Sequence, residues 1–293
     1  PVEMMVHDEA DQAERERVIK AMGLDKPWYI QYGRFVRNAA HGDLGKSFVY
    51  GEESLGIIVQ RMPATFELAL AALLLAIIFG IPLGVFTGLK PELRTSRVIM
   101  AGSILGFSLP TFWVGLMFIM VFAVMLGWLP STGRGETTEL FGIDVSFLTK
   151  DGLSHLFLPA LNLALFKISL VIRLARAGTR EVVHQDYIKF ARAKGLSAKR
   201  VIFVHLMKNI LIPVVTVLGL EFGGLIAFSV VTETVFAWPG MGKLIIDSIQ
   251  NLDRPVIVAY LMIIVLVFVI INLMVDVLYS ILDPRVRLQD VKA

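Results

Sequence analysis

The sequence predicts an all-α membrane protein with five transmembrane helices. Hydrophobic residues make up 56% of its 293 residues, charged residues make up 18%, and the mean hydropathy is +0.70. Soluble domains carry about a quarter charged residues, so this composition favours a chain that lies in a lipid bilayer. Five apolar runs have lengths near the roughly 20 residues that a helix needs to cross a bilayer core. Buried helices of a soluble fold are the alternative, which five such runs with charged loops between them disfavour.

Each predicted span coincides with one apolar run: residues 64–89, 99–126, 156–172, 210–231 and 256–281. Lysine and arginine are retained on the cytoplasmic side of a membrane, so the basic residues of the loops indicate orientation. Nine of them lie between the third and fourth spans, whereas the loop 127–155 holds only Arg134 and Lys150. We therefore expect the loop 180–209 and the C-terminus to be cytoplasmic, and the loops 127–155 and 232–255 to be periplasmic.

This topology divides the chain into an extracytoplasmic arm, residues 1–62, and a transmembrane domain, residues 63–293. The arm holds eight basic residues, but its length makes them a weak objection to an outside location. No segment before Val59 is apolar enough to cross a membrane or to serve as a signal peptide. We therefore expect an additional N-terminal transmembrane helix, upstream of Pro1, that is missing from this chain.

Several classes of chemistry have no signature in this sequence. The chain contains no cysteine, and its five histidines never fall at a ligand spacing, so no metal site is expected. Without a phosphate-binding loop or a nucleophile elbow, the chain has no local signature of ATP or ester hydrolysis, and any ATP must bind another chain. A secondary transporter would need inverted repeats and titratable residues near the midplane, where only Lys167 and Glu221 qualify. An intramembrane enzyme would need a nucleophile beside a base, and the spans show no such pairing.

The loop 180–209 is the most distinctive segment of the chain. Three apolar residues repeat at helical spacing on one face of a predicted helix over residues 180–194: Val183, Tyr187 and Phe190. Gly195 suits the left-handed residue that ends this helix, and Ser197 suits the cap of a second helix that continues into the next span. Such a pair of helices forms a knob that fits a groove on a partner, or else an amphipathic anchor on the anionic inner leaflet. Physical reasoning favours the two interpretations equally.

Residues 186–197, Asp-Tyr-Ile-Lys-Phe-Ala-Arg-Ala-Lys-Gly-Leu-Ser, resemble the coupling loop of binding-protein-dependent ABC importer permeases of the dipeptide, oligopeptide and nickel subfamily. Further subfamily signatures occur in the family's order at residues 24–27 (Leu-Asp-Lys-Pro), 42–47 (Gly-Asp-Leu-Gly-Lys-Ser), 63–68 (Pro-Ala-Thr-Phe-Glu-Leu), 108–113 (Ser-Leu-Pro-Thr-Phe-Trp), 127–130 (Gly-Trp-Leu-Pro), 233–242 (Glu-Thr-Val-Phe-Ala-Trp-Pro-Gly-Met-Gly) and 283–287 (Asp-Pro-Arg-Val-Arg). A lone Ala-x-Ala-Lys-Gly motif would be weak evidence for this family, but ordered matches over nearly the whole chain make the resemblance specific.

The resemblance implies the transmembrane domain of a type I ABC importer, with no catalysis and no cofactor on this chain. Its implied partners are a second homologous permease subunit, two cytoplasmic subunits that bind ATP and Mg, a periplasmic peptide-binding protein and the lipid of the bacterial inner membrane. Nucleic acid is not expected among them. Short peptides are the expected substrate, since the spans hold no cluster of His or carboxylates that suggests a path for metal. A nickel complex and glutathione are the alternatives.

The resemblance also assigns candidate site residues. The residues implied to couple this chain to the ATPase are Phe190, Ala191, Arg192, Ala193, Lys194, Gly195, Leu196 and Ser197. The residues expected to gate the pore or to contact the binding protein on the outer side are Phe236, Trp238, Pro239 and Gly240. An aromatic belt at the membrane interface is the alternative for this second set.

Three features depart from the broader permease pattern. Lys189 and Phe190 replace the Glu-Ala of the general motif, as is usual for the peptide subfamily. Lys167 and Glu221 are charged where the resemblance leads us to expect an apolar residue and a neutral amide. A charge inside a bilayer costs about 2.5 to 3.5 kcal/mol, so each needs a partner or water. The two residues pair with each other, or Lys167 snorkels toward the inner surface while Glu221 faces the partner subunit.

Overall fold

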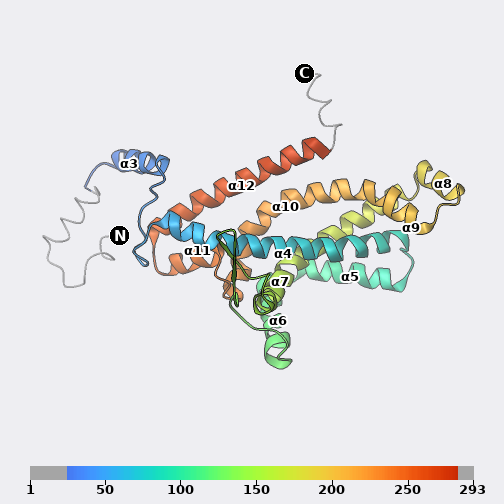
Figure 1. Ribbon diagram of the computed structural model, residues 1–293, viewed down its shortest axis with the longest axis horizontal. Coiled ribbons are helices and arrows are strands. Elements are labelled where there is room, and N and C mark those ends of the chain that lie inside the picture. Colours follow the sequence, from blue (N-terminus) through green and yellow to red (C-terminus); the bar gives the residue numbers. More distant parts are fainter. Residues whose placement is uncertain (1–24, 283–293) are drawn as a thin grey trace, which may run out of the picture.

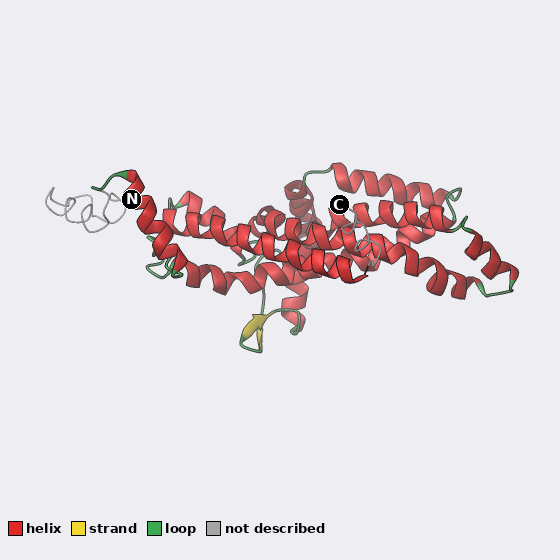
Figure 2. Ribbon diagram, turned by 90° about the horizontal axis from the view of Figure 1, so that it is seen from above, coloured by secondary structure: helices red, strands yellow, loops and turns green. Residues whose placement is uncertain are grey.

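The computed structural model describes residues 25–282 of the chain. Residues 1–24 and 283–293 lie outside the described part. The excluded residues contain the beginning of the predicted arm, the motif at 283–287 and the C-terminal tail, which the basic residues predict to be cytoplasmic. Within residues 25–282 the chain forms an elongated helical bundle (Figures 1 and 2).

Four helical segments are long and apolar enough to cross a membrane: α4 (Ser54–Leu89), α7 (Lys150–Val182), the continuous stretch Ala198–Val235 and α12 (Arg254–Leu282). The stretch Ala198–Val235 comprises α9 (Ala198–Arg200), the π-helix η2 (Val201–Leu206) and α10 (Met207–Val235). Each segment contains one predicted apolar run and extends beyond it. The helices outrun the apolar stretches because polar residues continue the hydrogen-bonded backbone beyond the hydrocarbon core.

The second predicted span is broken rather than continuous. The single helix expected over residues 99–126 is instead α5 (Arg94–Ser108), followed by α6 (Thr111–Phe118) and the π-helix η1 (Ile119–Met125), with a bend of 109° between the two parts. Pro110 explains the break, because it lacks a backbone N–H and forces the residue before it out of the helical region. Leu109 accordingly has extended backbone angles, φ −82° and ψ 138°.

Helices α4 and α7 approach each other closely along a stripe of small residues. Gly80, Gly84 and Gly88 recur every fourth residue on α4 and face α7, where a Cβ added at any of them would lie 2.6 Å from a side-chain carbon. Small residues let two helix backbones come close in a membrane, where packing rather than water exclusion drives association. This stripe therefore fixes α7 against α4 and gives the bundle a rigid centre.

Smaller elements occupy the two ends of the bundle. At one end lie α3 (Trp28–Ala40) and α11 (Met241–Gln250), and at the opposite end lies α8 (Asp186–Ala193) beside α9 (Figure 1). The antiparallel hairpin of β1 (Thr138–Leu140) and β2 (Ile143–Val145), with Glu139 opposite Asp144, stands out from the side of the bundle (Figure 2).

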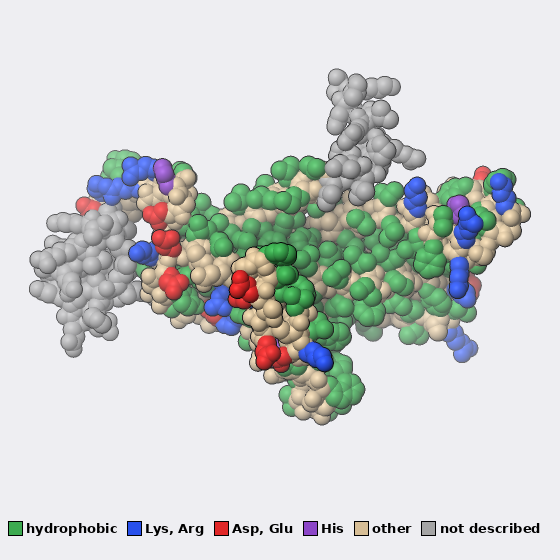
Figure 3. Space-filling view, in the orientation of Figure 1, with side chains coloured by type: hydrophobic (Ala, Val, Ile, Leu, Met, Phe, Trp, Pro, Cys, Tyr) green, Lys and Arg blue, Asp and Glu red, His purple; other side chains and the backbone are tan. Residues whose placement is uncertain are grey.

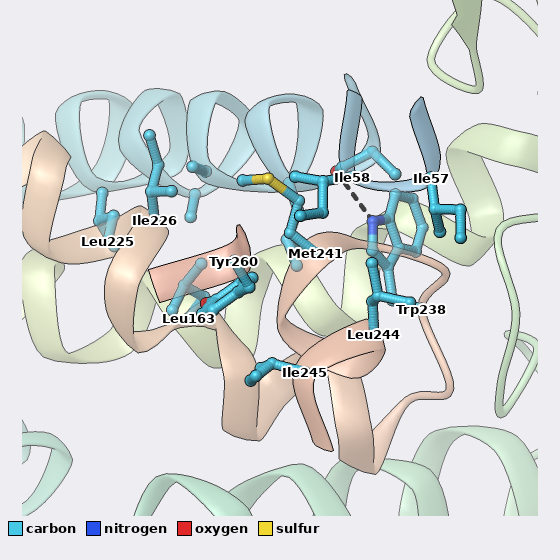
Figure 4. Packing of buried hydrophobic residues seen from close by; sticks show 14 of the residues in the cluster. Ile57, Ile58, Leu163, Leu225, Ile226, Trp238, Met241, Leu244, Ile245 and Tyr260 are labelled. Atoms are coloured by element: carbon cyan, nitrogen blue, oxygen red, sulfur yellow. Dashed lines mark hydrogen bonds between the residues drawn. The ribbon is translucent and has the colours of Figure 1, made fainter. Parts of the chain in front are cut away.

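The largest buried cluster lies near the α11 end. Figure 4 shows Trp238 and Met241 packed among side chains of several helices, including Ile58 of α4, Leu163 of α7 and Tyr260 of α12. These residues are apolar in the sequence and are close to fully buried. The cluster joins segments that are far apart in the chain and positions the loops described below.

Candidate functional site

The segment that connects α7 to α10 folds into a compact projection, which we call the tip (residues 183–206). Gly195 follows α8 with φ +77°, a left-handed conformation that glycine adopts without steric cost. Ser197 then accepts a hydrogen bond from the backbone N of Arg200, which caps the next helix. Both predictions for this turn are confirmed. The second helix runs without interruption through η2 into α10, also as predicted.

The first helix of the tip differs from its prediction. A helix was expected over residues 180–194, but α7 ends at Val182, and Gln185 adopts an extended conformation before α8 begins. The break turns α8 so that Ile188 and Ala191 pack on Val201 in a small core of their own. The free energy gained by burying Ile188 and Ala191 against Val201 outweighs the free energy that a longer α7 helix would gain.

Two of the three residues of the expected apolar face therefore lie on the outside of the tip, whereas Val183 is half-buried against the α7–α10 core. Tyr187 and Phe190 are 43% and 62% exposed, because Ile188 and Ala191 take the interior positions instead. Lys194 holds its ammonium group 4.7 Å from the centre of the Phe190 ring, a cation–π contact on the outer surface. Basic side chains gather at this end of the molecule (Figure 3).

The predicted coupling residues divide into two groups by exposure. Phe190, Ala193 and Gly195 are exposed, and nothing lies within 4 Å of a Cβ built on Gly195. Ala191 is only 5% exposed and Leu196 is half-buried against the tip core. The first group is free to contact a partner, whereas Ala191 and Leu196 hold the tip in shape.

At the other end, the turn between α10 and α11 forms the corner (residues 232–243), which is organised around the buried carboxylate of Glu233. Thr65 donates its hydroxyl to Glu233 Oε1 at 2.8 Å, and the backbone N of Lys243 donates to Oε2 at 3.0 Å. A Cβ on Gly240 would come within 2.6 Å of three atoms of the carboxyl group, and Gly242 is similarly confined. Glycine at these positions lets the backbone wrap the carboxylate.

Phe236 and Trp238 lie in the interior rather than at the surface. They are 1% and 0% exposed, Gly240 is buried and Pro239 is half-buried. Trp238 donates from Nε1 to the carbonyl oxygen of Ala64 at 2.9 Å, the dashed line in Figure 4. The two rings are therefore buried rather than exposed as an interfacial belt, and the role of this segment as a gate or a binding-protein contact stays a prediction.

A second buried carboxylate, Glu67 of α4, holds the loop before α7. Arg134 donates to Glu67 Oε2 from Nη2 at 2.6 Å and from Nε at 3.1 Å. Ser146 donates both its backbone N and its hydroxyl to Oε1, at 2.7 and 2.8 Å. The guanidinium also lies 5.8 Å from the centre of the Trp238 ring. The motif at residues 63–68 thus joins the hairpin loop to the corner.

A third buried carboxylate holds part of the arm. Asp253, at the turn before α12, is fully buried and accepts a hydrogen bond from the hydroxyl of Ser47. The backbone N of Phe48 donates to its Oδ1 at 3.1 Å. Gly42 and Gly45 have φ +84° and +89°, which turns the arm toward this contact. These contacts hold residues 47 and 48 of the arm against the turn before α12, at the α11 end.

Lys167 and Glu221, which interrupt the third and fourth spans, form an ion pair. Lys167 of α7 donates from Nζ to Glu221 Oε2 of α10. Lys167 is buried, whereas 38% of the Glu221 side chain is exposed. Of the two alternatives left open by the sequence, direct pairing is the one that the structure shows. Among residues 25–282, no three His, Cys, Asp or Glu side chains come together as a metal site would require.

Comparison with protein families identifies the chain. Residues 80–288, a range that includes the tip and the corner, match the family described as "Binding-protein-dependent transport system inner membrane component". The chain belongs to this family. It is therefore a multi-pass permease subunit of the inner membrane.

Individual relatives match over nearly their full length. The chain is 41% identical to the di/tripeptide transport system permease protein DppB of Pseudomonas aeruginosa, with 99% of this chain and 90% of that protein covered. It is 40% identical to the oligopeptide transport system permease protein AppB of Bacillus subtilis, with 98% and 89% covered. It is 37% identical to the glutathione transport system permease protein GsiC of Escherichia coli, with 98% and 89% covered.

Among solved structures, the fold is similar to the inward-facing MetNI methionine ABC transporter. The TM-score is 0.61, the sequences are 16% identical, and the match covers 78% of this chain and 97% of the other. This permease therefore has the fold of an ABC importer transmembrane subunit, as the sequence predicts.

The roles of three buried carboxylates and one half-buried cation were not predicted from the sequence: Glu67, Glu233 and Asp253, with Arg134. A signal existed for two of them, because Glu67 and Glu233 are acids beside long apolar runs, where an unpaired charge is costly. Their partners were not readable, since the Glu233 hydrogen bond to Thr65 joins residues 168 positions apart.

Proposed function

We propose that this chain is the permease subunit of an ATP-driven importer of short peptides. The observation that carries the proposal is the similarity over 98% or more of the chain to permeases named for di- and tripeptide and for oligopeptide transport. The glutathione permease is similar over the same share of the chain. Because glutathione is itself a small peptide derivative, it is the second candidate substrate.

The proposed assembly contains this chain, a second homologous permease subunit, two ATP-binding subunits and a peptide-binding protein. ATP and Mg bind the ATP-binding subunits, and this chain has no catalytic step of its own. The tip and the C-terminus face the cytoplasm, whereas the α11 end faces the periplasm, as the distribution of basic residues favours. The tip then meets the ATPase, and the α11 end meets the binding protein.

The tip supports coupling because it is compact and is attached directly to two spans. Its core of Ile188, Ala191 and Val201 holds α8 against η2, which continues into α10. A push on the exposed Phe190 and Ala193 is therefore transmitted to α7 and α10 without a flexible linker. The amphipathic-anchor alternative does not require this separate core.

The spans that carry the tip are braced to move together. Helix α7 is packed on α4 along the glycine stripe, and Glu233 joins α10 to α4 through Thr65. Closure of the ATPase subunits would rock this braced unit against the partner permease and switch the path between inward-open and outward-open states.

Co-purification with ATPase measurement tests the proposal. The tagged chain is isolated from its native membrane into nanodiscs, and ATP hydrolysis is measured with and without peptide-loaded binding protein. We expect ATPase subunits to co-purify and the loaded binding protein to stimulate hydrolysis. A chain that purifies without ATPase subunits would contradict the proposal. Stimulation by glutathione-loaded but not dipeptide-loaded binding protein would assign the second substrate.

A further inference from the structure

The ion pair of Lys167 and Glu221 lies at the middle of the bundle. Both residues are close to the midpoints of their helices, α7 (Lys150–Val182) and α10 (Met207–Val235). Lys167 is 7% exposed, but 38% of the Glu221 side chain is accessible. Because a charge in hydrocarbon is costly, the accessible part of Glu221 is expected to face water or protein rather than lipid.

The surface around Glu221 is an open strip of α10. Glu221, Gly224 and Phe228 follow one another at i, i+3 and i+7, which places them on one helix face. Nothing lies within 4 Å of a Cβ built on Gly224, and Phe228 is 77% exposed. The described residues of this chain leave the strip uncovered, so it is a surface on which another molecule can lie.

Aromatic rings lie beside the Lys167 ammonium on the other side of the pair. The Lys167 ammonium lies 5.3 Å from the centre of the Phe166 ring, and Phe166 stacks on Phe107 of α5 with centroids 4.3 Å apart. Arg173 holds its guanidinium 4.8 Å from the centre of the Phe107 ring. The carboxylate of Glu221 and the Lys167 ammonium beside its ring thus form a polar site within otherwise apolar spans, and Arg173 follows the predicted end of the third span.

We propose that Lys167 and Glu221 line the substrate path at mid-membrane and bind the two terminal charges of a peptide. The ammonium group of the peptide pairs with Glu221, and its carboxylate pairs with Lys167. Without a peptide, the two side chains neutralise each other. When a peptide binds, the Lys167–Glu221 contact is replaced by two ion pairs between these side chains and the peptide termini, so no charge is left unpaired. This inference rests on the proposed function.

A variant that removes both charges, called the neutral pair, distinguishes peptide binding by this ion pair from a purely structural role. The variant Lys167→Met/Glu221→Gln removes both charges and keeps similar side-chain volumes, a replacement that is often neutral or stabilising for a buried ion pair. In proteoliposomes that contain the complete transporter, we expect dialanine uptake to fall about tenfold or more, the effect of one lost charged contact. Stimulation of ATP hydrolysis by the loaded binding protein stays unchanged. The control is Glu92→Gln/Arg94→Met, which removes an exposed acid between α4 and α5 and an exposed base at the start of α5 and leaves uptake unchanged.

Accessibility of the strip gives a second measurement. The chain has no cysteine, so Gly224→Cys introduces a single thiol on the open strip, and Val269→Cys places one on the 55% exposed face of α12. In the assembled transporter we expect a charged, water-soluble methanethiosulfonate to modify the thiol at position 224 and not the thiol at position 269.

The outcomes distinguish the two proposals. Uptake by the native transporter together with equal uptake by the neutral pair overturns the inference and leaves the proposed function intact. A thiol at position 224 that reacts as slowly as the one at 269 also overturns the inference, even if the neutral pair fails to assemble. Absence of dialanine uptake by the native transporter overturns the proposed function, and the inference with it.

Discussion

The indole Nε1 of Trp238 donates a hydrogen bond to the carbonyl oxygen of Ala64, 2.9 Å away, and joins residues that are 174 positions apart. The bond sets the corner against α4 at the point where Glu233 accepts its bond from Thr65. These two contacts make the α11 end of the permease a rigid cap on the spans. We therefore expect substitutions here to act through stability.

Replacing Trp238 by phenylalanine should lower stability by about 2 kcal/mol, since it removes one hydrogen bond and leaves a small cavity. The thermal unfolding midpoint of the purified complex measures the loss. Trp28→Phe is the matched control, because Trp28 is 78% exposed and its replacement should change stability by less than about 0.5 kcal/mol. Equal midpoints for the two variants would show that the corner contributes little.

Replacing Gly84 by alanine should destabilise the contact between α4 and α7. The added Cβ would lie 2.6 Å from the Ala175 Cβ and 2.7 Å from the carbonyl oxygen of Ile172, and such overpacking costs about 1–3 kcal/mol. Gly102→Ala in α5 has open space around it, so there the substitution should stabilise the helix by about 0.5–1 kcal/mol. Unfolding midpoints that shift in opposite directions are the expected result; a common shift would contradict the close packing.

Replacing Arg134 by alanine should release the hairpin loop. The substitution leaves the Glu67 carboxylate buried without its cation, a change that typically costs about 3–5 kcal/mol. Chymotrypsin cleavage at Phe141, which is 97% exposed in the hairpin, should then proceed faster than in the native protein. Lys150→Ala, at an exposed position, should leave the cleavage rate as it is. An unchanged rate in the Arg134 variant would mean that other contacts hold the loop.

Replacing Ala193 by arginine should abolish uptake while the protein still inserts and folds, because Ala193 is exposed on the outer face of the tip. Radiolabelled dipeptide uptake and the amount of assembled complex measure the two properties separately. Ala40→Arg, an exposed position at the end of α3, should affect neither. Normal uptake with arginine at 193 would show that the outer face of the tip does not contact the ATPase.

The sequence predicts a helix well where the length of an apolar run determines it. It predicts less well the places where a neighbouring residue breaks the helix or where packing against a distant residue determines the local structure. The bend of 109° follows Leu109 and Pro110, which a count of apolar residues does not register. The break before α8 depends on Ile188 packing against Val201 across the tip. Trp238 resembles part of an exposed aromatic turn until Ala64 and Arg134 are placed beside it.

The ion pair illustrates the same limit at the candidate path. Position and charge identify Lys167 and Glu221 as unusual, because each interrupts an apolar run. Pairing, however, depends on how α7 and α10 are rotated against each other, and that rotation is set by their contacts with α4 and with the tip. Sequence reasoning therefore found the two residues and left their relationship open.

The most direct test of the central claim is labelled dipeptide uptake into proteoliposomes that hold the complete transporter, measured with and without enclosed ATP and again after an ionophore collapses the proton gradient. We expect uptake that requires ATP and loaded binding protein and that survives loss of the gradient. Uptake that continues without ATP and stops when the gradient is collapsed would contradict the account and identify a gradient-driven carrier.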